Sequence, residues 1–393
     1  MLTHGLEIRS FSNEPGADWQ KVREFVQFHR DHYAAEPRYI PLLDYEYLGS
    51  KLLGMVGFLE PRNSFFKTGR IRFFMAYRDG KPVGRVNAYL NDRHNQIWKD
   101  QVGFFGNFEC IDDSQVASAL LESCESWLKA QGMNAMRGPL NFPMNEATPG
   151  VLVEGFDSRP VVYYHFNYEY YARLLRDTGL APIKNYFSWD ISVNKNPIEE
   201  DLGPLSRKIM ARYQVTLEPW SMRKLDERKK EMFDIYNDAW SDNFGFVPFL
   251  REEFYRIIDD MQLVMNPKMF LFAYVKGEPA AFFGAVPNIF EILSPKAPLG
   301  GIEILRAAKL LAFKSKIRGF RLGYLGVKKS FRKLGLDGLL FWRQNQVSRE
   351  EGYEYCDIGW VLEDNPLTIR LVERTGAVLS KKYTLFEKEI VTR

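Results

Sequence analysis

Residues 76–91, AYRDGKPVGRVNAYLN, and residues 273–288, AYVKGEPAAFFGAVPN, decide the fold. The two stretches share six identical residues in sixteen positions at an offset of 197. In each, a Gly stands two residues before a Pro between apolar runs, which is the pattern of a β-hairpin, because Gly and Pro suit the turn and apolar residues suit the strands. The sequence therefore predicts the same hairpin in both halves of the chain.

Two further matches precede the hairpin in the same order in both halves. Residues 39–43, YIPLL, correspond to residues 246–250, FVPFL, and a strand-like stretch followed by an amphipathic helix comes earlier still (6–11 and 19–33 in the first half, 215–220 and 225–240 in the second). One hairpin of this kind is common, but three matches in collinear order favour a tandem duplication.

The rest of each half alternates between strand and helix patterns. In the second half these are strand 320–327, helix 335–350, strand 355–362, helix 367–375 and strand 378–387; in the first they are strand 102–109, helix 116–131, strand 133–139, helix 168–178 and strand 183–191. We therefore predict a mixed α/β (α+β) fold used twice. The expected domains are residues 1–197 and 198–393, with the boundary in the polar, Pro- and Gly-containing stretch 194–205.

Charge and cysteine content exclude several classes of protein. The net charge is +3, from 53 Lys and Arg against 50 Asp and Glu, which argues against a DNA-coating protein. Cys110, Cys124 and Cys356 are isolated, so neither a disulfide framework nor a metal site is indicated, and we expect buried thiols. The longest nearly apolar run, 52–59, is too short to span a membrane, and the N-terminus lacks a signal-peptide pattern. We expect a soluble cytoplasmic protein.

The sharpest local signal is residues 327–338, VKKSFRKLGLDG, between an expected strand and an expected helix. At such a junction backbone N–H groups and the positive end of the helix dipole can hold a pyrophosphate, and Gly335 lets the ligand approach closely. Lys328, Lys329, Arg332 and Lys333 add positive charge. A solvated basic turn before a helix has the same pattern, so the loop alone leaves both interpretations open.

The element order and two motifs resemble the GNAT superfamily of acyl-CoA-dependent N-acyltransferases. Residues 332–336, RKLGL, match its Q/R-x-x-G-x-G/A signature up to the last position, where Asp337 stands, and Asn365, Leu371 and Gly376 match its following N-x5-L-x4-G pattern. Tandem copies are also similar to Fem-type aminoacyl transferases and N-myristoyltransferases. The resemblance covers the second half well and the first by topology and duplication. It implies acetyl-CoA or another acyl-CoA, bound by Leu325, Gly326, Val327, Lys328, Arg332, Lys333, Leu334, Gly335, Leu336, Asp337, Gly338 and Asn365.

Two residues depart from that family pattern. Asp337 places a carboxylate where phosphates would lie, so either the loop shifts to use Gly338 or cofactor binding is weakened. Val372 stands where the family often has a tyrosine that acts as general acid. The thiolate would then leave with another proton donor or water, which is feasible for a thiol with a pKa of about 8.5.

The first half lacks the phosphate loop. Its equivalent turn, residues 111–116, reads IDDSQV, with two carboxylates and no Gly. Asp or Ser there is an ordinary helix N-cap, and the negative charge would repel a pyrophosphate. We infer that only the second half binds CoA and that the first is a degenerate copy with an acceptor-binding or structural role.

An insertion in the first half, residues 136–171, contains further candidates. Six of the nine residues 163–171 are aromatic, which suits either packing between the halves or the lining of a site. The candidates for binding the acceptor are Asn141, Asn145, Glu146, Glu154 and Tyr163. His165 is a candidate base because the ordinary pKa of His lies near neutrality, although a single His is often structural.

Other candidate bases lie near the expected ends of the two central strands of the second half: Tyr324, Asp357, Glu363 and Asp364. Glu363 and Asp364 also suit capping of the next helix. The sequence contains no Ser-His-Asp, HExxH or Walker pattern, so hydrolase, metalloprotease and P-loop functions have no support.

Three functions remain open. The leading hypothesis is an N-acyltransferase in which the amine of a small molecule or peptide attacks the thioester directly, while a backbone N–H near Val327 stabilises the oxyanion. A Fem-like transferase would hold aminoacyl-tRNA with Lys314, Lys316, Arg318 and Arg321, but the balanced charge and the lack of a coiled-coil arm argue against tRNA. The third is a non-catalytic ligand-binding relic, suggested by Asp337 and Val372. The sequence does not specify the acceptor or the oligomeric state.

Overall fold

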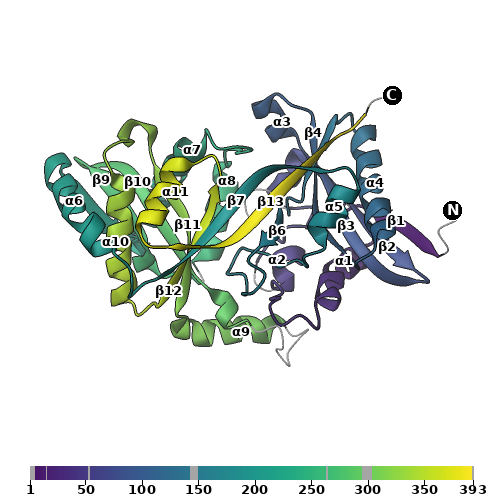
Figure 1. Ribbon diagram of the computed structural model, residues 1–393, viewed down its shortest axis with the longest axis horizontal. Helices are drawn as coiled ribbons and strands as arrows, with labels where there is room; N and C mark the ends of the chain where they lie inside the picture. The colour runs from purple at the N-terminus through teal and green to yellow at the C-terminus, as the bar shows by residue number, and fades with distance from the viewer. Residues whose placement is uncertain are drawn as a thin grey trace. The chain divides into compact units, whose positions relative to one another are not determined.

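The computed structural model describes residues 5–14, 16–51, 54–141, 149–262, 264–293 and 303–391. The chain divides into two compact units (Figure 1). The first unit comprises Met1–Tyr186, Leu293–Ala307 and Lys381–Arg393, and the second comprises Phe187–Ile292 and Ala308–Ser380. Each unit has helices and a mixed sheet, which confirms the predicted fold class.

The first unit is built on strands in the order β1-β2-β3-β4-β5. Neighbouring strands are antiparallel except β4 and β5, which are parallel. Its elements are β1 (Leu6–Phe11), α1 (Trp19–His32), α2 (Asp44–Leu48), η1 (Ser64–Lys67), β2 (Gly69–Arg78), β3 (Lys81–Asn91), α3 (Asp92–Trp98), β4 (Val102–Cys110), α4 (Ser114–Ala130), β5 (Ala135–Gly138), β6 (Val151–Glu154) and α5 (Tyr171–Asp177).

The second unit repeats this arrangement, with strands in the order β8-β9-β10-β11-β12. Its elements are α6 (Ile198–Tyr213), β8 (Val215–Pro219), η2 (Met222–Lys224), α7 (Leu225–Trp240), α8 (Arg251–Met261), η3 (Pro267–Met269), β9 (Phe270–Val275), β10 (Glu278–Pro287), η4 (Ile289–Glu291), η5 (Lys314–Lys316), β11 (Gly319–Val327), η6 (Lys329–Phe331), α10 (Leu336–Glu350), β12 (Tyr355–Leu362) and α11 (Pro366–Arg374). Helix α9 (Glu303–Phe313) has residues in both units.

The repeated sequence forms the same hairpin twice, β2–β3 and β9–β10, as predicted. Both central residues of each turn have positive φ: 50° for Asp79 and 76° for Gly80, and 50° for Lys276 and 83° for Gly277. Two positive φ values define a type I′ turn, whose twist matches that of the paired strands. The shared Gly is therefore required by the backbone of both turns.

The last strand of each repeat contributes to the sheet of the other unit. Strand β7 (Ala181–Ser192) ends in the second unit and neighbours β12, while β13 (Val378–Glu389) ends in the first unit. The C-terminal part of β13 pairs with β5 from Phe386↔Gly138 to Glu389↔Ala135. A division at residue 197 would place all of β7 in the first unit and all of β13 in the second. Instead, each of these strands begins in one compact unit and ends in the other.

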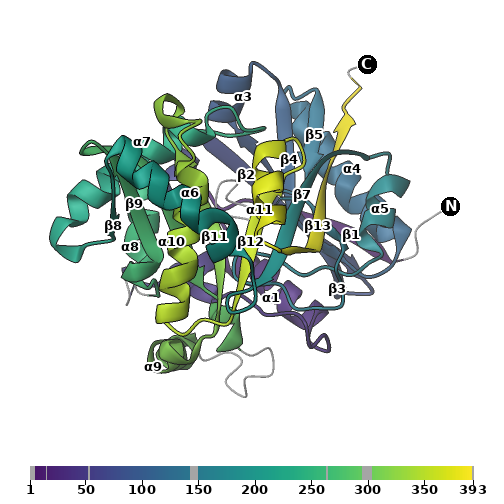
Figure 2. The same ribbon diagram turned by 60° about the vertical axis from the view of Figure 1, so that its left-hand side comes forward.

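Helix α6 occupies most of the polar stretch that indicated a domain boundary. Pro204 lies inside this helix, and Glu199, Glu200 and Asp201 fill its first turn. Acidic residues at a helix N-terminus are stabilised by the helix dipole, which favours helix formation despite the proline. In Figure 2 α6 lies beside α10, and the Trp342 indole donates a hydrogen bond to Glu199 at 2.6 Å.

Helices α7 and α10 cover opposite faces of β10 and β11. Phe282 of β10 meets Trp240 of α7, with ring centres 6.0 Å apart, whereas the next residue, Phe283, meets Phe341 of α10 at 5.4 Å. Successive side chains of a strand point to opposite faces, so these two contacts identify the two layers. The second unit is therefore a sheet between two helical layers.

The three cysteines are buried and free, as predicted. Among the described helices, none is long and apolar enough to cross a membrane. A group of side chains suited to holding a metal ion is likewise absent from the described residues.

We predict that Phe386→Ala destabilises the first unit, although Phe386 lies close to the C-terminus. The side chain is fully buried in the core cluster of that unit. Truncating such a side chain costs about 3–5 kcal/mol. Urea unfolding measures the loss, and hydrogen exchange at β5 assigns it to the first unit. Val391→Ala, at a position 69% exposed, is the control and should change the unfolding free energy by less than about 0.5 kcal/mol; equal effects of the two variants would contradict the strand exchange.

Candidate active site

The central strands of the second unit part in the middle of the sheet. Parallel pairing of β11 with β12 runs from Gly319↔Tyr355 to Leu322↔Ile358, while β11 continues to Val327. The pairing of β11 with β10 also shifts by one residue here, between Gly284↔Tyr324 and Ala285↔Leu322, which leaves Gly323 as the extra residue of a β-bulge. The C-terminal half of β11 therefore has one paired edge and one edge beyond the ladder.

The direction of the backbone N–H groups on β11 follows from one hydrogen bond. Lys328 N–H donates to the Ala280 carbonyl at 2.9 Å, toward β10. The register from Leu325 to Val327 is regular, and alternate residues of a strand direct their N–H groups to opposite edges. The N–H groups of Val327 and Leu325 therefore point away from β10, to the edge where pairing with β12 has ended.

The N-terminus of α10 follows directly. Gly335 is its N-cap residue, with φ of 77°, and no side chain caps the helix. The positive φ favours glycine at position 335, and a Cβ atom there would lie 2.7 Å from Ile209 Cδ1, so the end of that side chain would have to shift. The first N–H groups of an α-helix have no partner within the helix, and together with the helix dipole they form a binding site for an anion.

Two of the four basic residues of the loop are paired with Asp242, which follows the end of α7. Lys329 Nζ lies 2.7 Å and Arg332 Nη1 3.3 Å from the Asp242 carboxylate. The hydrogen bond from Lys329 is the main reason that the pKa of Asp242 lies below its ordinary value. Lys328 and Lys333 form no ion pair with the part of the chain that the structure describes. Asp242 therefore offsets part of the positive charge expected at this loop.

Asp337 and Val372, the two residues that depart from the family pattern, differ in burial. Asp337 lies half-buried in the first turn of α10, where its carboxylate makes no hydrogen bond or ion pair with a described residue. Val372 is fully buried on α11. Asp337 therefore does not cap α10, and position 372 offers no proton donor.

The catalytic candidates of the second unit lie at the ends of β11 and β12. Tyr324 is half-buried on β11 at the bulge, and Glu363 and Asp364 follow the end of β12. Asn365 caps α11 by accepting a hydrogen bond from Thr368 N–H at 3.3 Å. This contact gives Asn365 a structural role.

The corresponding place in the first unit is filled by its own chain. Parallel pairing of β4 with β5 ends at Phe104↔Arg137, but Leu140 N–H still donates to the Phe105 carbonyl at 2.7 Å. Asn141 Oδ1 accepts the N–H of Asn107 at 2.8 Å; Asn107 lies in a bulge of β4 with φ of 46°. The backbone groups that remain at the open edge of β11 are thus paired internally in β4.

The N-terminus of α4 is also closed, unlike that of α10. The Asp113 carboxylate accepts the N–H groups of Gln115 and Val116, at 2.8 and 3.2 Å. A carboxylate at this position occupies the donors that an anion would need. Both observations agree with the expectation that the first copy is degenerate.

The remaining acceptor candidates belong to the first unit, and two of them contact other residues there. Asn141 holds the bulge of β4, and the exposed Glu154 pairs with Lys382 at 3.1 Å. Tyr163 has φ of 68°. Asn145 and Glu146 lie outside the described residues.

The aromatic segment 163–171 packs inside the first unit. The Tyr33 hydroxyl donates to the Tyr171 hydroxyl at 2.9 Å, and the Tyr164 ring stacks on Tyr383 with centres 5.4 Å apart. The aromatic side chains of this segment therefore serve in large part to pack the core of the first unit.

His165 has an altered pKa. Burial disfavours the charged imidazolium and lowers the pKa of His165 to about 4. A general base works best when its pKa lies near the working pH, so a group with this pKa is a weak base at pH 7.

Three features of the site were not identified from the sequence. The bulge at Gly323 has a signal, because a Gly inside a strand often marks a bulge. The Asp242 contacts join residues about 90 positions apart, and the internal pairing of Asn141 depends on a turn whose path the sequence pattern does not specify.

Sequence comparison finds curated relatives of similar length. The chain is 27% identical over 403 residues to Protein YghO of Escherichia coli (strain K12), covering 99% of this chain and 97% of that protein. It is 29% identical over 345 residues to the bacterial ceramide synthase of Caulobacter vibrioides (strain NA1000 / CB15N), covering 84% and 87%. No family model matches the chain.

Comparison with solved structures shows the fold. A tandem GNAT protein from the clavulanic acid biosynthesis pathway superimposes with a TM-score of 0.57 at 14% identity, covering 99% of both chains. The GCN5-related glucosamine N-acetyltransferase region of a fungal multi-domain GH3 β-N-acetylglucosaminidase gives a TM-score of 0.58 at 11% identity, covering 99% of this chain and 38% of the other. The chain therefore has a tandem GNAT-like fold, as the motifs indicated.

We predict that Asp242→Asn strengthens CoA binding at the loop, because it removes a negative charge beside Lys329 and Arg332. Isothermal titration at low salt should show about twofold to fivefold tighter binding, and the gain should shrink as salt screens the charges. Asp234→Asn is the control. Asp234 lies on α7 and pairs with Lys230 of that helix at 2.8 Å, away from the loop residues Lys329 and Arg332 with which Asp242 pairs. Weaker binding in Asp242→Asn would show that this carboxylate positions the loop instead of opposing the ligand.

We predict that His165 makes the first unit sensitive to acid. Its pKa in the folded state, about 4, lies below the value of about 6.5 for an unfolded chain, so the unfolded state binds more protons between these values. The stabilisation is complete above pH 6.5 and is lost as the pH falls toward 4. In urea unfolding across this pH range, the unfolding free energy should fall less steeply with decreasing pH for His165→Gln than for the unaltered protein. Part of the dependence of the unfolding free energy on pH should remain in His165→Gln, because burial also lowers the pKa of His29. An NMR titration in which His165 takes up its proton near pH 6.5 would contradict the prediction.

Proposed function

We propose that this protein is an acyl-CoA-dependent N-acyltransferase and that its second unit binds the acyl-CoA. Two open backbone features that follow one another along the chain carry the proposal. The first is the edge of β11 beyond its ladder with β12, which ends at Leu322, and the second is the uncapped start of α10 at Gly335. A thioester with a pyrophosphate group needs both, a strand edge for its amide-bearing arm and a helix N-terminus for its phosphates.

The residues of the second unit suit that ligand. The N–H groups of Leu325 and Val327 point to the open edge and can donate to carbonyl oxygens of the pantetheine arm or the thioester. Lys328 and Lys333 supply positive charge beside the helix start. Asp337 makes no contact that would close the helix start, so the backbone donors remain accessible there.

The reaction follows from these positions. The nitrogen of the acceptor amine attacks the thioester carbonyl carbon, the new C–N bond replaces the C–S bond, and the amine loses one proton. A backbone N–H at Leu325 or Val327 stabilises the oxygen that becomes negative during the attack. The leaving sulfur departs as thiolate or takes the proton from water, because position 372 is a buried valine. Tyr324, Glu363 and Asp364 remain our candidates for accepting the amine proton.

We further propose a long-chain amino alcohol as the acceptor class. The support is the relative named bacterial ceramide synthase, which is 29% identical to this chain. A ceramide is the amide of a fatty acid and a long-chain amino alcohol, so an N-acyltransferase is the class of enzyme that forms its amide bond.

The other two candidate functions receive less support. A tRNA-dependent transferase was expected to use Arg321, but this side chain is buried and its guanidinium lies over the Trp360 ring, 4.7 Å from the centroid. A non-catalytic relic was expected to show Asp337 occupying the helix start, and α10 has no side-chain cap.

The test is an assay of thiol release from acetyl-CoA and palmitoyl-CoA with a panel of amines that includes sphinganine, a soluble polyamine and a peptide. We predict acylation of sphinganine, with amide formation confirmed by mass spectrometry. Failure of every amine, together with no CoA binding by calorimetry, would overturn the proposal.

Gly335→Ala gives a matched test of the proposed binding loop. An alanine there is strained at φ of 77° and requires the end of the Ile209 side chain to shift, so the start of α10 should move and CoA affinity should fall about tenfold. Gly352→Ala, at the other end of α10, has the same φ of 77° but open space around its Cβ. It reproduces the backbone strain and should leave CoA binding unchanged, whereas equal losses in both variants would assign the effect to helix stability.

A further inference from the structure

A run of exposed apolar and basic side chains lies in the second unit, at the end of α9 and in η5. Residues 308–318, AKLLAFKSKIR, contain four basic residues and no acidic residue. The side chains of residues 311–316 are all exposed, whereas Leu310 and Ile317 are buried. We name residues 308–318 the basic-apolar segment.

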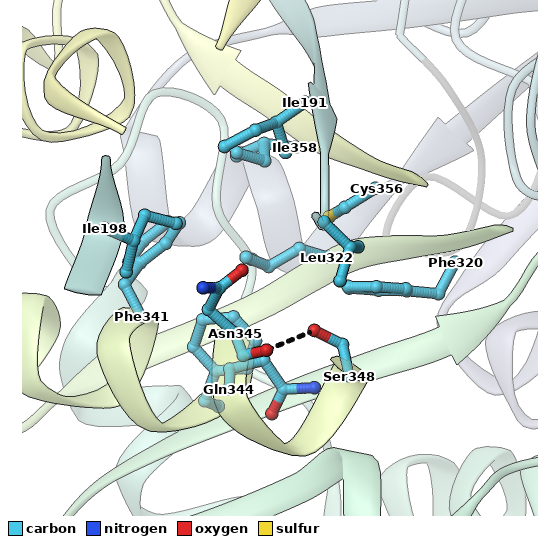
Figure 3. Close-up of a pocket in the computed structure, with 12 residues that line it drawn as sticks. Ile191, Ile198, Phe320, Leu322, Phe341, Gln344, Asn345, Ser348, Cys356 and Ile358 are labelled. Atoms are coloured by element: carbon cyan, nitrogen blue, oxygen red, sulfur yellow. Dashed lines mark hydrogen bonds between the residues drawn. The ribbon is translucent and has the colours of Figure 1, made fainter. Parts of the chain in front are cut away.

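Buried residues on either side hold the exposed part of this segment at the surface. Leu310 and Ile317 are each only 4% exposed, and the Ile317 N–H donates to the Lys314 carbonyl at 3.3 Å. The chain then enters β11, where the Phe320 side chain lines a small internal space beside α10 (Figure 3). The residues between Leu310 and Ile317 therefore have anchored ends.

The apolar side chains of the segment share one side of α9. Leu311 is 51% exposed and Phe313, the last residue of the helix, is 40% exposed. Ala308 lies three residues before Leu311 and four before Ala312, and all three are exposed on one helix face. Single exposed apolar side chains are common, but a group of them rimmed by polar residues is typical of a binding surface.

The basic side chains of the segment surround these apolar groups. Lys309, Lys314 and Lys316 form no ion pair with any residue that the structure describes. Arg318 lies 3.9 Å from the Glu354 carboxylate, which offsets part of its charge. Lys316 Nζ lies over the Phe313 ring, 4.8 Å from the centroid. The surface therefore suits a partner that is both anionic and apolar.

We propose that the basic-apolar segment binds the surface of an anionic phospholipid bilayer. Leu311 and Phe313 enter the boundary between headgroups and acyl chains, and Lys314 and Lys316 contact the lipid phosphates. The long lysine stems allow each ammonium group to stay among the headgroups while the apolar side chains lie deeper. The inference goes beyond the proposed reaction, and it would hold the second unit at the membrane where a long-chain amino alcohol dissolves.

Two other partners match only part of the surface. Transfer RNA would use the lysines but would leave Leu311 in water, and Arg321, the fourth basic residue considered for RNA, is buried. A second copy of the chain, related by a twofold axis, would place the same lysines against one another, and like charges repel. A bilayer complements both the positive charge and the apolar side chains.

The experiment is co-sedimentation of the full chain with lipid vesicles, without CoA or an amine. One set of vesicles contains phosphatidylcholine alone, and the other contains equal amounts of phosphatidylcholine and phosphatidylglycerol. We expect tighter binding to the vesicles with phosphatidylglycerol, and this binding should weaken as salt screens the charges. Equal binding to both vesicles, or to neither, would overturn the proposal. The thiol-release assay tests the proposed reaction separately, because the vesicle measurement contains no substrate.

A double variant with a matched control assigns the binding to the segment. Leu311→Gln with Lys314→Gln should lower the affinity for phosphatidylglycerol vesicles at least about fivefold, which is the contribution of one lysine at such a surface. The control is Leu205→Gln with Lys208→Gln on α6. Leu205 is also 51% exposed, and Lys208 is exposed three residues later. The control should bind like the unaltered protein; equal losses in the two double variants, or no loss in the first, would overturn the assignment.

The same proteins test the two other partners. Binding of labelled tRNA is followed by fluorescence anisotropy, and self-association is followed by analytical ultracentrifugation. If the Leu311 and Lys314 changes abolish tRNA binding or dissociate a dimer, and the unaltered protein does not bind vesicles, the surface belongs to that partner and the bilayer proposal is wrong. Both double variants should keep the thermal transition of the unaltered protein, because the replaced side chains are exposed.

Discussion

The parallel pairing of β11 with β12 ends at Leu322 and Ile358, and the chemistry that we propose for the second unit depends on that ending. Backbone N–H groups are obligatory hydrogen-bond donors, so a strand that continues beyond its ladder offers them to another molecule. The bulge at Gly323 turns this edge away from regular pairing, and the strand leads directly to the uncapped start of α10. One interruption of the sheet thus provides an open strand edge that leads to the uncapped helix N-terminus.

The first unit has the same interruption and closes it. The chain after β5 returns to β4 through Leu140, Asn141 pairs with the bulge, and Asp113 caps α4. Each contact satisfies a donor that is left open in the second unit. The duplication has therefore kept the architecture in both units while the open backbone donors remain in only one of them.

Local patterns in the sequence were sufficient for the fold of each repeat. Each of these patterns lies within a short stretch of sequence and predicts the element formed by that stretch. Examples are the Gly of the hairpin turns, the spacing of apolar residues in α7 and the basic loop before α10. The exchange of β7 and β13 was not predictable in this way, because it is decided by pairing between distant segments such as Phe386 and Gly138. The same limit applies to the site. The position of Gly335 followed from a motif, but the Asp242 contacts depend on side chains that the complete fold brings together.

The most direct measurement of the central claim is hydrogen exchange of the backbone amides with and without saturating CoA. Our account predicts that CoA protects amides in residues 325–338, at the open edge of β11 and the start of α10, and leaves those at residues 107–116 of the first unit unchanged. Protection confined to residues 107–116, or no protection in either region while CoA is bound, would contradict it.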